Sequence, residues 1–364
     1  MDELKKLSNT IINYSLKLKK GDRVQITYGN KECTKLVKYL INDIYDNEGI
    51  VNTKLVDYEI SSLLMERASS SELDHMVKIK EFEVDNYDCY IHICYNENEY
   101  EGRNIASSIR RELGEKSDKY DDIRINKRRW VLLNYPSVMD AYKAKMKNDE
   151  FYNYAMRVMN VDYAKMKDKI EPLKKLMEKT DKVRIVSPGT DLTFSIKGMP
   201  VIPCLGECNI PDGEIYTAPH KESVNGFITY NTPSPYQGYT YENIKLEFKD
   251  GKIIKCSSKD NNEGLEKIFN TDIGARYIGE FSFGLNPEIL HPMGDILYDE
   301  KIKGSIHFTP GKCYQDSDNG NRSAIHWDLV LIQREDYGGG EIYLDDKLIR
   351  KDGLFVIDEL KSLN

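Results

Sequence analysis

The chain has 364 residues, a formal net charge of −8 and a sequence pI near 5.5, with 40% hydrophobic and 31% charged residues. This acidic balance argues against non-specific binding to nucleic acid, which needs a basic surface, and no stretch approaches the roughly 18 apolar residues that span a membrane. The length suggests two domains. Seven scattered cysteines without a C-x-x-C pair, and an acidic start in place of a signal peptide, predict a cytoplasmic protein with reduced thiols.

The first half of the chain alternates predicted helices and strands. Apolar periodicity predicts helices over residues 2–19, 32–45, 59–80 and 103–115, and strands over 23–27, 50–58, 87–94 and 129–133. Such alternation is typical of a parallel sheet flanked by helices. This half contains neither G-x-G-x-x-G nor G-x-x-x-x-G-K-[ST], so nucleotide binding has no support here.

The second half has a different pattern. A helical region from Pro136 to about Lys179 precedes short predicted strands over 183–186, 192–196, 226–230, 244–248 and 253–256, with one helix near 264–269. We therefore predict an α/β (α+β) protein. Residues 1–180 form an N-terminal β/α domain with a parallel sheet and a helical connector, and residues 181–364 form a mixed, β-rich α/β domain that carries a metal site.

Candidate metal ligands concentrate in the second half. His326 and Asp328 lie two apart in an apolar segment, so on a strand both side chains point to one face. His307 lies in another alternating segment. Glu214 follows a Pro-Asp-Gly turn, and Glu280 has apolar neighbours, where a carboxylate costs free energy unless it is paired or coordinating. An H-x-D pair alone is weak evidence for a metal site, because most strand histidines have structural roles.

Several of these segments, taken in order, resemble the aminopeptidase T family of metallo-aminopeptidases, the thermophilic aminopeptidases of peptidase family M29. The resemblance covers nearly the whole chain. Its strongest parts are P-D-G-E-I-Y-T-A-P at 211–219, G-E-F at 279–281, D-E and G-S-I-H-F within 299–308, and H-W-D at 326–328. K-x-G-D-x-V-x-I at 19–26, N-V-D-Y at 160–163 and P-G-T-D-L at 188–192 fit the family as well.

The resemblance implies a pair of divalent metal ions, with zinc expected and cobalt or manganese able to substitute, and it implies a homodimer. Tyr314 matches the catalytic tyrosine, and Glu280 matches the central acid of the site. The spacing from Glu300 to His307 is longer than in the family pattern, and the segment from His307 to His326 is shorter. The implied metal ligands are Glu214, Glu280, Glu300, His307, His326 and Asp328.

These residue types suit metal-assisted hydrolysis. Mixed carboxylate and imidazole ligands favour Zn²⁺, Co²⁺ or Mn²⁺, and two such ions can lower the pKa of a shared water toward ~7. Glu280 is the first candidate for the proton carrier, although a residue that bridges two ions is the poorer base. Tyr314 can donate a hydrogen bond to the developing oxyanion.

The leading hypothesis is a cytoplasmic aminopeptidase that removes residues from peptides with a free N-terminus. The alternatives are a dinuclear metallohydrolase of another amide or ester, and a metal-binding protein without turnover.

Overall fold

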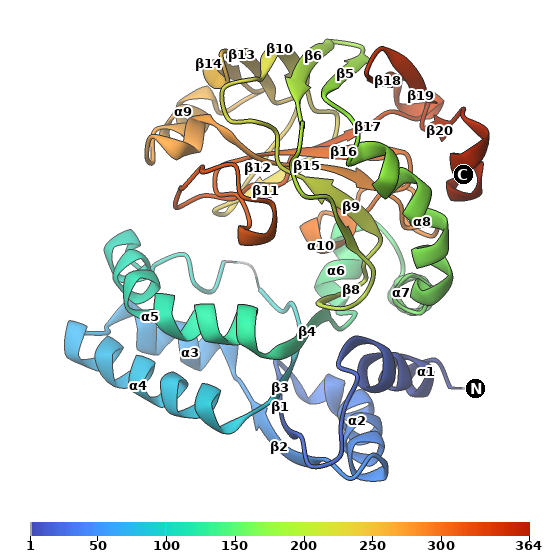
Figure 1. The fold of residues 1–364 in the computed structure, drawn as a ribbon. Coiled ribbons are helices and arrows are strands. Elements are labelled where there is room, and N and C mark those ends of the chain that lie inside the picture. Colours follow the sequence, from blue (N-terminus) through green and yellow to red (C-terminus); the bar gives the residue numbers. More distant parts are fainter. Residues whose placement is uncertain (1, 99) are drawn as a thin grey trace. The chain divides into compact units, whose positions relative to one another are not determined.

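The computed structural model describes residues 2–98 and 100–364, which form two compact units (Figure 1). One unit comprises the chain up to Asn160 together with Gly206–Pro211, and the other comprises Val161–Leu205 and Asp212–Asn364. The domain boundary predicted near residue 180 refers to independently folding domains, and it stays a prediction. Within the described residues, no helix combines the length and the apolar character that crossing a membrane requires.

The first unit is built on a five-stranded parallel sheet in the order β2-β1-β3-β4-β8. Its inner strands are apolar on both faces, as in β3, where Tyr90, Ile91 and Ile93 are all buried, because helices cover both sides of the sheet. The strands are β1 (Arg23–Tyr28), β2 (Ile50–Leu55), β3 (Cys89–Cys94), β4 (Arg129–Asn134) and β8 (Asn209–Ile210).

Helices α4 and α5 lie side by side on one face of this sheet, and α1 packs beside α2 on the other (Figure 1). Helix α2 buries Leu36, Leu40 and Ile44, which recur at helical spacing. The helices are α1 (Glu3–Asn9), continued by a π-helical turn (Thr10–Ser15), α2 (Thr34–Asp46), α3 (Tyr58–Glu66), α4 (Ser70–Asn86), α5 (Ser107–Lys127), α6 (Val138–Lys143) and α7 (Asn148–Met159).

The helical region predicted over 59–80 is divided between two helices, α3 and α4. The Ser69 hydroxyl accepts a hydrogen bond from the backbone N–H of Glu72, and the Glu72 carboxylate accepts one from the backbone N–H of Ser69, so this capping box starts α4 as a new helix. The Asp57 carboxylate caps the start of α3 by accepting a hydrogen bond from the backbone N–H of Ile60, and β2 ends at Leu55 rather than at residue 58.

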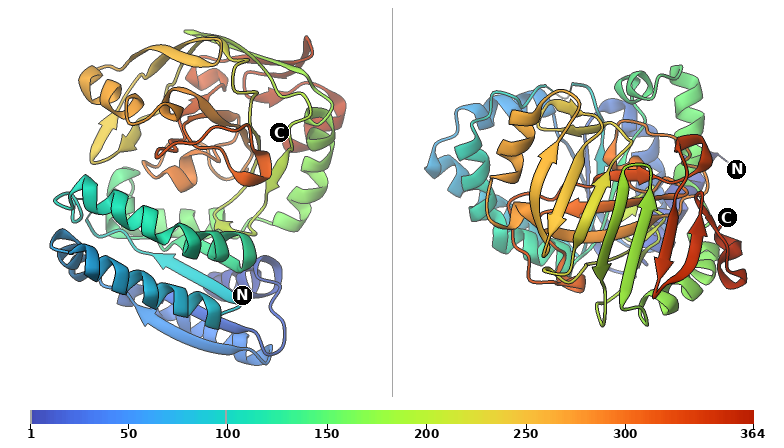
Figure 2. Two further views of the ribbon diagram at one scale, coloured as in Figure 1. Left: turned by 60° about the vertical axis from the view of Figure 1, so that its left-hand side comes forward. Right: turned by 90° about the horizontal axis from the view of Figure 1, so that it is seen from above.

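The second unit contains two antiparallel sheets, seen from above in Figure 2 with the larger one in front. The larger sheet has the order β14-β13-β10-β6-β5-β18-β19-β20, and the smaller has the order β17-β16-β15-β9-β7. Strands of the larger sheet are β5 (Lys182–Ser187), β6 (Thr190–Ser195), β10 (Asn225–Thr229), β13 (Lys245–Lys249), β14 (Lys252–Ser257), β18 (Glu341–Leu344), β19 (Lys347–Lys351) and β20 (Leu354–Phe355).

The smaller sheet and its surroundings complete this unit. Its strands are β7 (Ile202–Cys204), β9 (Glu214–Thr217), β15 (Ile278–Gly284), β16 (Ser305–Pro310) and β17 (Val330–Ile332). The hairpin β11 (Ser234–Tyr236) and β12 (Tyr239–Tyr241) and the helices α8 (Tyr163–Met177), α9 (Asn262–Phe269) and α10 (Ile296–Asp299) lie outside both sheets.

An aromatic core fills the space between the two sheets. Phe194 of β6 lies with its ring 5.0 Å from the rings of Phe281 and Phe308, and Phe248 of β13 also contacts Phe308. One face of the smaller sheet therefore packs against the larger sheet, as expected where two sheets stack. The other face of the smaller sheet is left for polar side chains. The predicted fold class, a parallel β/α unit followed by a β-rich mixed unit, is confirmed.

Candidate metal centre

Along three neighbouring strands of the smaller sheet, successive side chains point to opposite faces of the sheet. Phe281 and Phe283 of β15 point to the aromatic core, so Glu280 and Ser282 point to the opposite face. Ser282 pairs in register with His307 of β16 on one side and with Tyr216 of β9 on the other. The strand period of two therefore brings residues from separate segments to one polar face.

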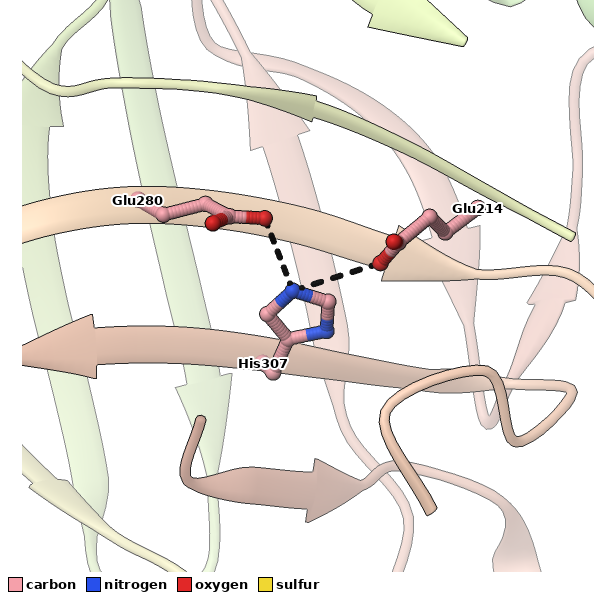
Figure 3. Close-up of side chains that lie close together, drawn as sticks. All are labelled: Glu214, Glu280 and His307. Atoms are coloured by element: carbon pink, nitrogen blue, oxygen red, sulfur yellow. Dashed lines mark hydrogen bonds and ion pairs between the residues drawn. The ribbon is translucent and has the colours of Figure 1, made fainter. Parts of the chain in front are cut away.

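Glu214, Glu280 and His307 converge on this face (Figure 3). The Nε2 atom of His307 lies 3.0 Å from Oε1 of Glu280 and 3.3 Å from Oε2 of Glu214. All three residues are buried, and His307 is only 1% exposed. Three ligand atoms this close together, two of them anionic, form a group that could hold a metal ion.

A second group shares Glu280 with the first. Its other oxygen, Oε2, lies 3.5 Å from Nε2 of His326, and the same nitrogen lies 3.2 Å from Oδ1 of Asp328. His326 and Asp328 lie just before β17, where the chain still runs antiparallel to the end of β16, as the bridge between Gly311 and His326 shows. Glu280, His326 and Asp328 are again close enough to hold one ion.

The two imidazoles are oriented in the same way. Nδ1 of His307 lies 3.1 Å from the carbonyl oxygen of Glu300, and Nδ1 of His326 lies 2.8 Å from that of Lys312. A carbonyl oxygen can only accept, so both Nδ1 atoms carry a proton and Nε2 is the nitrogen that faces the carboxylates. Metal-binding histidines are usually fixed by this type of second hydrogen bond.

This orientation requires a positive charge between the groups. In a neutral imidazole each Nε2 would direct a lone pair at carboxylate oxygens, which is repulsive unless a proton or a metal ion lies between them. Oε2 of Glu280 is buried and has no hydrogen-bond partner within the described part of the chain. A buried anionic oxygen without a partner is costly, and a bound cation would remove that cost.

The pKa values of these groups respond to the same negative charge. Burial alone would lower the pKa of His326, but Asp328 and Glu280 prevail and raise it to about 10. Burial likewise opposes charge on His307, whose pKa is nevertheless raised by Glu214 and Glu280. Burial raises the pKa of Glu280, whereas His326 holds the pKa of Asp328 low despite its burial. Without metal, the surrounding carboxylates therefore favour the protonated form of both imidazoles.

Residues behind the two groups fix the carboxylates. The Ser282 hydroxyl donates to Oε2 of Glu214 over 3.1 Å, and the Thr309 hydroxyl donates to Oδ1 of Asp328 over 2.7 Å. Lys301 is fully buried, and its ammonium contacts Glu300 and lies 3.5 Å from Oε1 of Glu214. Ser282, Thr309 and Lys301 were not among the predicted site residues.

Glu300 differs from the other expected ligands. Its carboxylate pairs with Lys301, its backbone carbonyl accepts from His307, and it belongs to neither three-residue group among the described residues. The other five expected ligands, Glu214, Glu280, His307, His326 and Asp328, all lie in the two groups.

Tyr314 lies next to the second group, with its ring 4.9 Å from that of His326 and 5.6 Å from that of Tyr216. The residues that follow Tyr314 are held by hydrogen bonds to strand β9 and the residue after it. Tyr216 donates to Asp316 over 2.7 Å, and the Ser317 hydroxyl accepts from the backbone of Ala218 over 2.9 Å. Within residues 2–98 and 100–364 the Tyr314 hydroxyl makes no hydrogen bond, and 49% of the residue is exposed.

The remaining conspicuous side chains near the site have structural partners. Trp327, between His326 and Asp328, is buried and stacks on Tyr236. Of the histidines outside the two groups, His220 contacts the carbonyl oxygen of Lys197, and His291 contacts the hydroxyl of Tyr337.

Comparison with known proteins identifies the family of this chain. The sequence model described as thermophilic metalloprotease (M29) matches residues 1–344. The chain belongs to the M29 metalloprotease family.

Curated relatives agree with this M29 assignment. Aminopeptidase 2 of Geobacillus stearothermophilus is 30% identical over 161 residues, which cover 40% of this chain and 37% of the relative. Aminopeptidase T of Thermus aquaticus is 28% identical over 178 residues, covering 41% of this chain and 42% of the relative. The matched region thus spans about two fifths of the length of each of these relatives.

Solved structures extend the M29 comparison to the whole fold. Wild-type AmpT from Thermus thermophilus superimposes with a TM-score of 0.79 at 19% identity, covering 98% of this chain and 99% of that chain. A 2,5-dihydroxypyridine dioxygenase from Pseudomonas putida superimposes with a TM-score of 0.64 at 14% identity, covering 98% of each. Because a hydrolase and an oxygenase share this fold, function has to be argued from the site.

Proposed function

We propose that this M29 protein is a metal-dependent aminopeptidase that removes N-terminal residues from peptides. The single observation that carries the proposal is the pair of groups that share Glu280, each with an imidazole Nε2 directed at carboxylate oxygens. The chemistry of the donors and the unpartnered Oε2 of Glu280 fit two divalent cations. The names of the relatives, aminopeptidase 2 and aminopeptidase T, support the reaction type.

In this proposal Glu214, Glu280 and His307 hold one ion, and Glu280, His326 and Asp328 hold the other. Zinc is the proposed metal, and cobalt or manganese could substitute, since mixed oxygen and nitrogen ligands suit all three. When bound, the ions supply Lewis acidity that polarises the peptide carbonyl and activates water.

The protein's own side chains perform the remaining steps. The Tyr314 hydroxyl is free to donate a hydrogen bond to the carbonyl oxygen as negative charge develops on it. The Glu280 carboxylate, which belongs to both groups, is the candidate that carries the proton to the leaving amine, although a residue that bridges two ions is the poorer base. A free α-amine could coordinate one bound ion through its lone pair, which an acylated nitrogen does not offer, and this would restrict cleavage to the first residue of a peptide.

A direct test compares two matched substrates. The zinc-loaded protein is incubated with an aminoacyl-anilide and with its N-acetylated form, and release of the anilide is measured. We expect cleavage of the free form only. Equal cleavage of both forms would contradict an aminopeptidase and favour another amide hydrolase, and cleavage of neither would contradict an enzyme of this class.

We further propose that the protein acts in the cytoplasm as a homodimer. All seven cysteines are free thiols, which supports a reducing compartment. The homodimer rests on the resemblance to the M29 family, and light scattering coupled to size-exclusion chromatography tests it.

A further inference from the structure

The two candidate metal positions have matching donors but different surroundings. Each combines two carboxylates with one imidazole, and Glu280 is common to both. Donor type and number alone therefore predict similar affinities for a given ion. Any difference between the positions has to come from the groups around them.

Lys301 is the clearest difference. Its ammonium lies 3.5 Å from Oε1 of Glu214 and pairs with Oε1 of Glu300. Around the second position, Asp328 instead accepts from the neutral hydroxyl of Thr309. A full positive charge is thus built in beside the Glu214 position, where the other position has an uncharged donor.

The ammonium is held where it is. Lys301 is 0% exposed, follows the C-cap residue Glu300 of α10, and lies in the turn that leads into β16. Its backbone N–H donates to the carbonyl of Tyr298, and its carbonyl accepts from the N–H of Asn286, both over 3.0 Å. With the backbone tied on both sides and the side chain buried, the charge cannot move out to solvent when a metal ion arrives.

Two consequences follow for Glu214. Oε1 faces the ammonium, so Oε2, next to His307, is the oxygen left for a metal. An ion at this position is also repelled by the buried ammonium, which lies closer to Glu214 than a screened surface charge would and whose field its counter-ion Glu300 offsets only in part. Glu300, whose carboxylate is neutralised by the same lysine, is drawn away from both groups.

We propose that Lys301 makes the two metal positions unequal, so that an ion at Glu214, Glu280 and His307 binds more weakly than an ion at Glu280, His326 and Asp328. In this assignment Glu300 is the counter-ion of Lys301 and not a metal ligand. The inference rests on the proposed metal centre and deepens it: the ion next to Lys301 is the exchangeable one.

The first test is calorimetric titration of the metal-free full-length protein with Zn²⁺ in the presence of a competing chelator. We expect two binding steps in the wild type that differ by about tenfold or more, the lower end of what residues behind metal ligands contribute. Lys301→Met should bring the two steps together, and Lys301→Arg, which keeps the charge, should leave them apart. Lys303→Met, a half-buried lysine two residues away, is the matched control and should titrate like the wild type.

A double-mutant cycle then locates the effect. In a His326→Ala background only the position beside Lys301 remains intact, and adding Lys301→Met should tighten Zn²⁺ binding by about tenfold. In a His307→Ala background the same change should alter the affinity less than twofold. Weaker binding in the first background, or equal effects in both, would overturn the inference.

The wild-type titration keeps the proposal testable even if the Lys301 variants do not fold. Two equal steps would overturn the role of Lys301 and leave the metal centre intact. No Zn²⁺ binding at all would overturn the proposed metal centre and, with it, this inference.

Discussion

His307 and Glu280 face each other from neighbouring antiparallel strands, with Nε2 of the imidazole 3.0 Å from Oε1 of the carboxylate. The other ring nitrogen is committed to the carbonyl of Glu300, so the atom between the two side chains is either a proton or a metal ion. Proton and metal compete for the same place, which links metal affinity to pH.

Zinc uptake by the metal-free protein is expected to release protons. The pKa of His326 is raised to about 10, so its imidazole is protonated at neutral pH and has to lose that proton on binding. The carboxylates of Glu214 and Glu280 raise the pKa of His307 as well, which favours proton release in the same direction. The affinity for Zn²⁺ should therefore rise with pH, by about tenfold per pH unit for each proton released.

Calorimetric titration in two buffers with different ionisation enthalpies counts the protons released. His220→Ala, which removes a histidine whose ring contacts the carbonyl oxygen of Lys197, is a matched control with unchanged proton release. A binding enthalpy that is identical in both buffers would show that the imidazoles are already neutral and would contradict this prediction.

The zinc content of single-residue variants should show which of the two groups holds each ion. We expect His326→Ala or Glu214→Gln to lower the zinc bound per chain from two toward one, because each variant removes a ligand from a single group. Glu280→Gln should lower the content of both positions, because its two oxygens belong to different groups. His291→Ala, whose ring contacts the hydroxyl of Tyr337, should retain the full content. Elemental analysis of dialysed protein measures all four variants, and unchanged zinc in Glu280→Gln would contradict the shared ligand.

The polar face that carries the candidate centre was largely predictable from sequence. Alternation around His307 and the H-x-D spacing of His326 and Asp328 already predicted that these side chains share a face, because the strand period of two is a local property, although His326 and Asp328 lie just before β17 and not within it. That these strands lie next to the strand of Glu214 followed only from the family resemblance, since pairing between segments far apart in sequence leaves no local signal.

Lys301 shows where sequence reasoning was limited. In the string Asp-Glu-Lys, a lysine beside two acids is typical of a solvated surface, yet this side chain is fully buried.

Strand β8 was also not predicted from the sequence. Two residues, Asn209 and Ile210, join the parallel sheet of the first unit after the chain has already entered the second, and such a short pairing has no periodicity to detect. By contrast, the capping box at Ser69 and Glu72 could have been recognised from the sequence alone.

The hydroxyl of Thr309 is expected to tune the second metal position. It donates to Oδ1 of Asp328 over 2.7 Å and so fixes the direction of that carboxylate. Thr309→Val keeps the shape of the side chain and removes the donor, which should weaken Zn²⁺ binding at the position of His326 and Asp328 by about tenfold. Thr217→Val is a suitable control, because the Thr217 hydroxyl donates to the carbonyl of Pro200 and not to a candidate ligand. Equal Zn²⁺ affinity in both variants would show that Thr309 has only a structural role.

Tyr314 should affect turnover and not metal binding. Its ring packs between His326 and Tyr216, so Tyr314→Phe keeps these contacts and removes only the hydroxyl. If that hydroxyl stabilises the developing oxyanion, kcat on an aminoacyl-anilide should fall by about 10²- to 10³-fold, as when other oxyanion donors are lost. Zinc content and the melting temperature should stay at the wild-type values, and Tyr343→Phe, which removes a surface hydroxyl bonded to Glu341, should leave kcat unchanged. Loss of zinc in Tyr314→Phe would instead identify the tyrosine as part of the metal centre, because a group that acts only on the transition state lowers kcat without changing the affinity of the free enzyme for its metal.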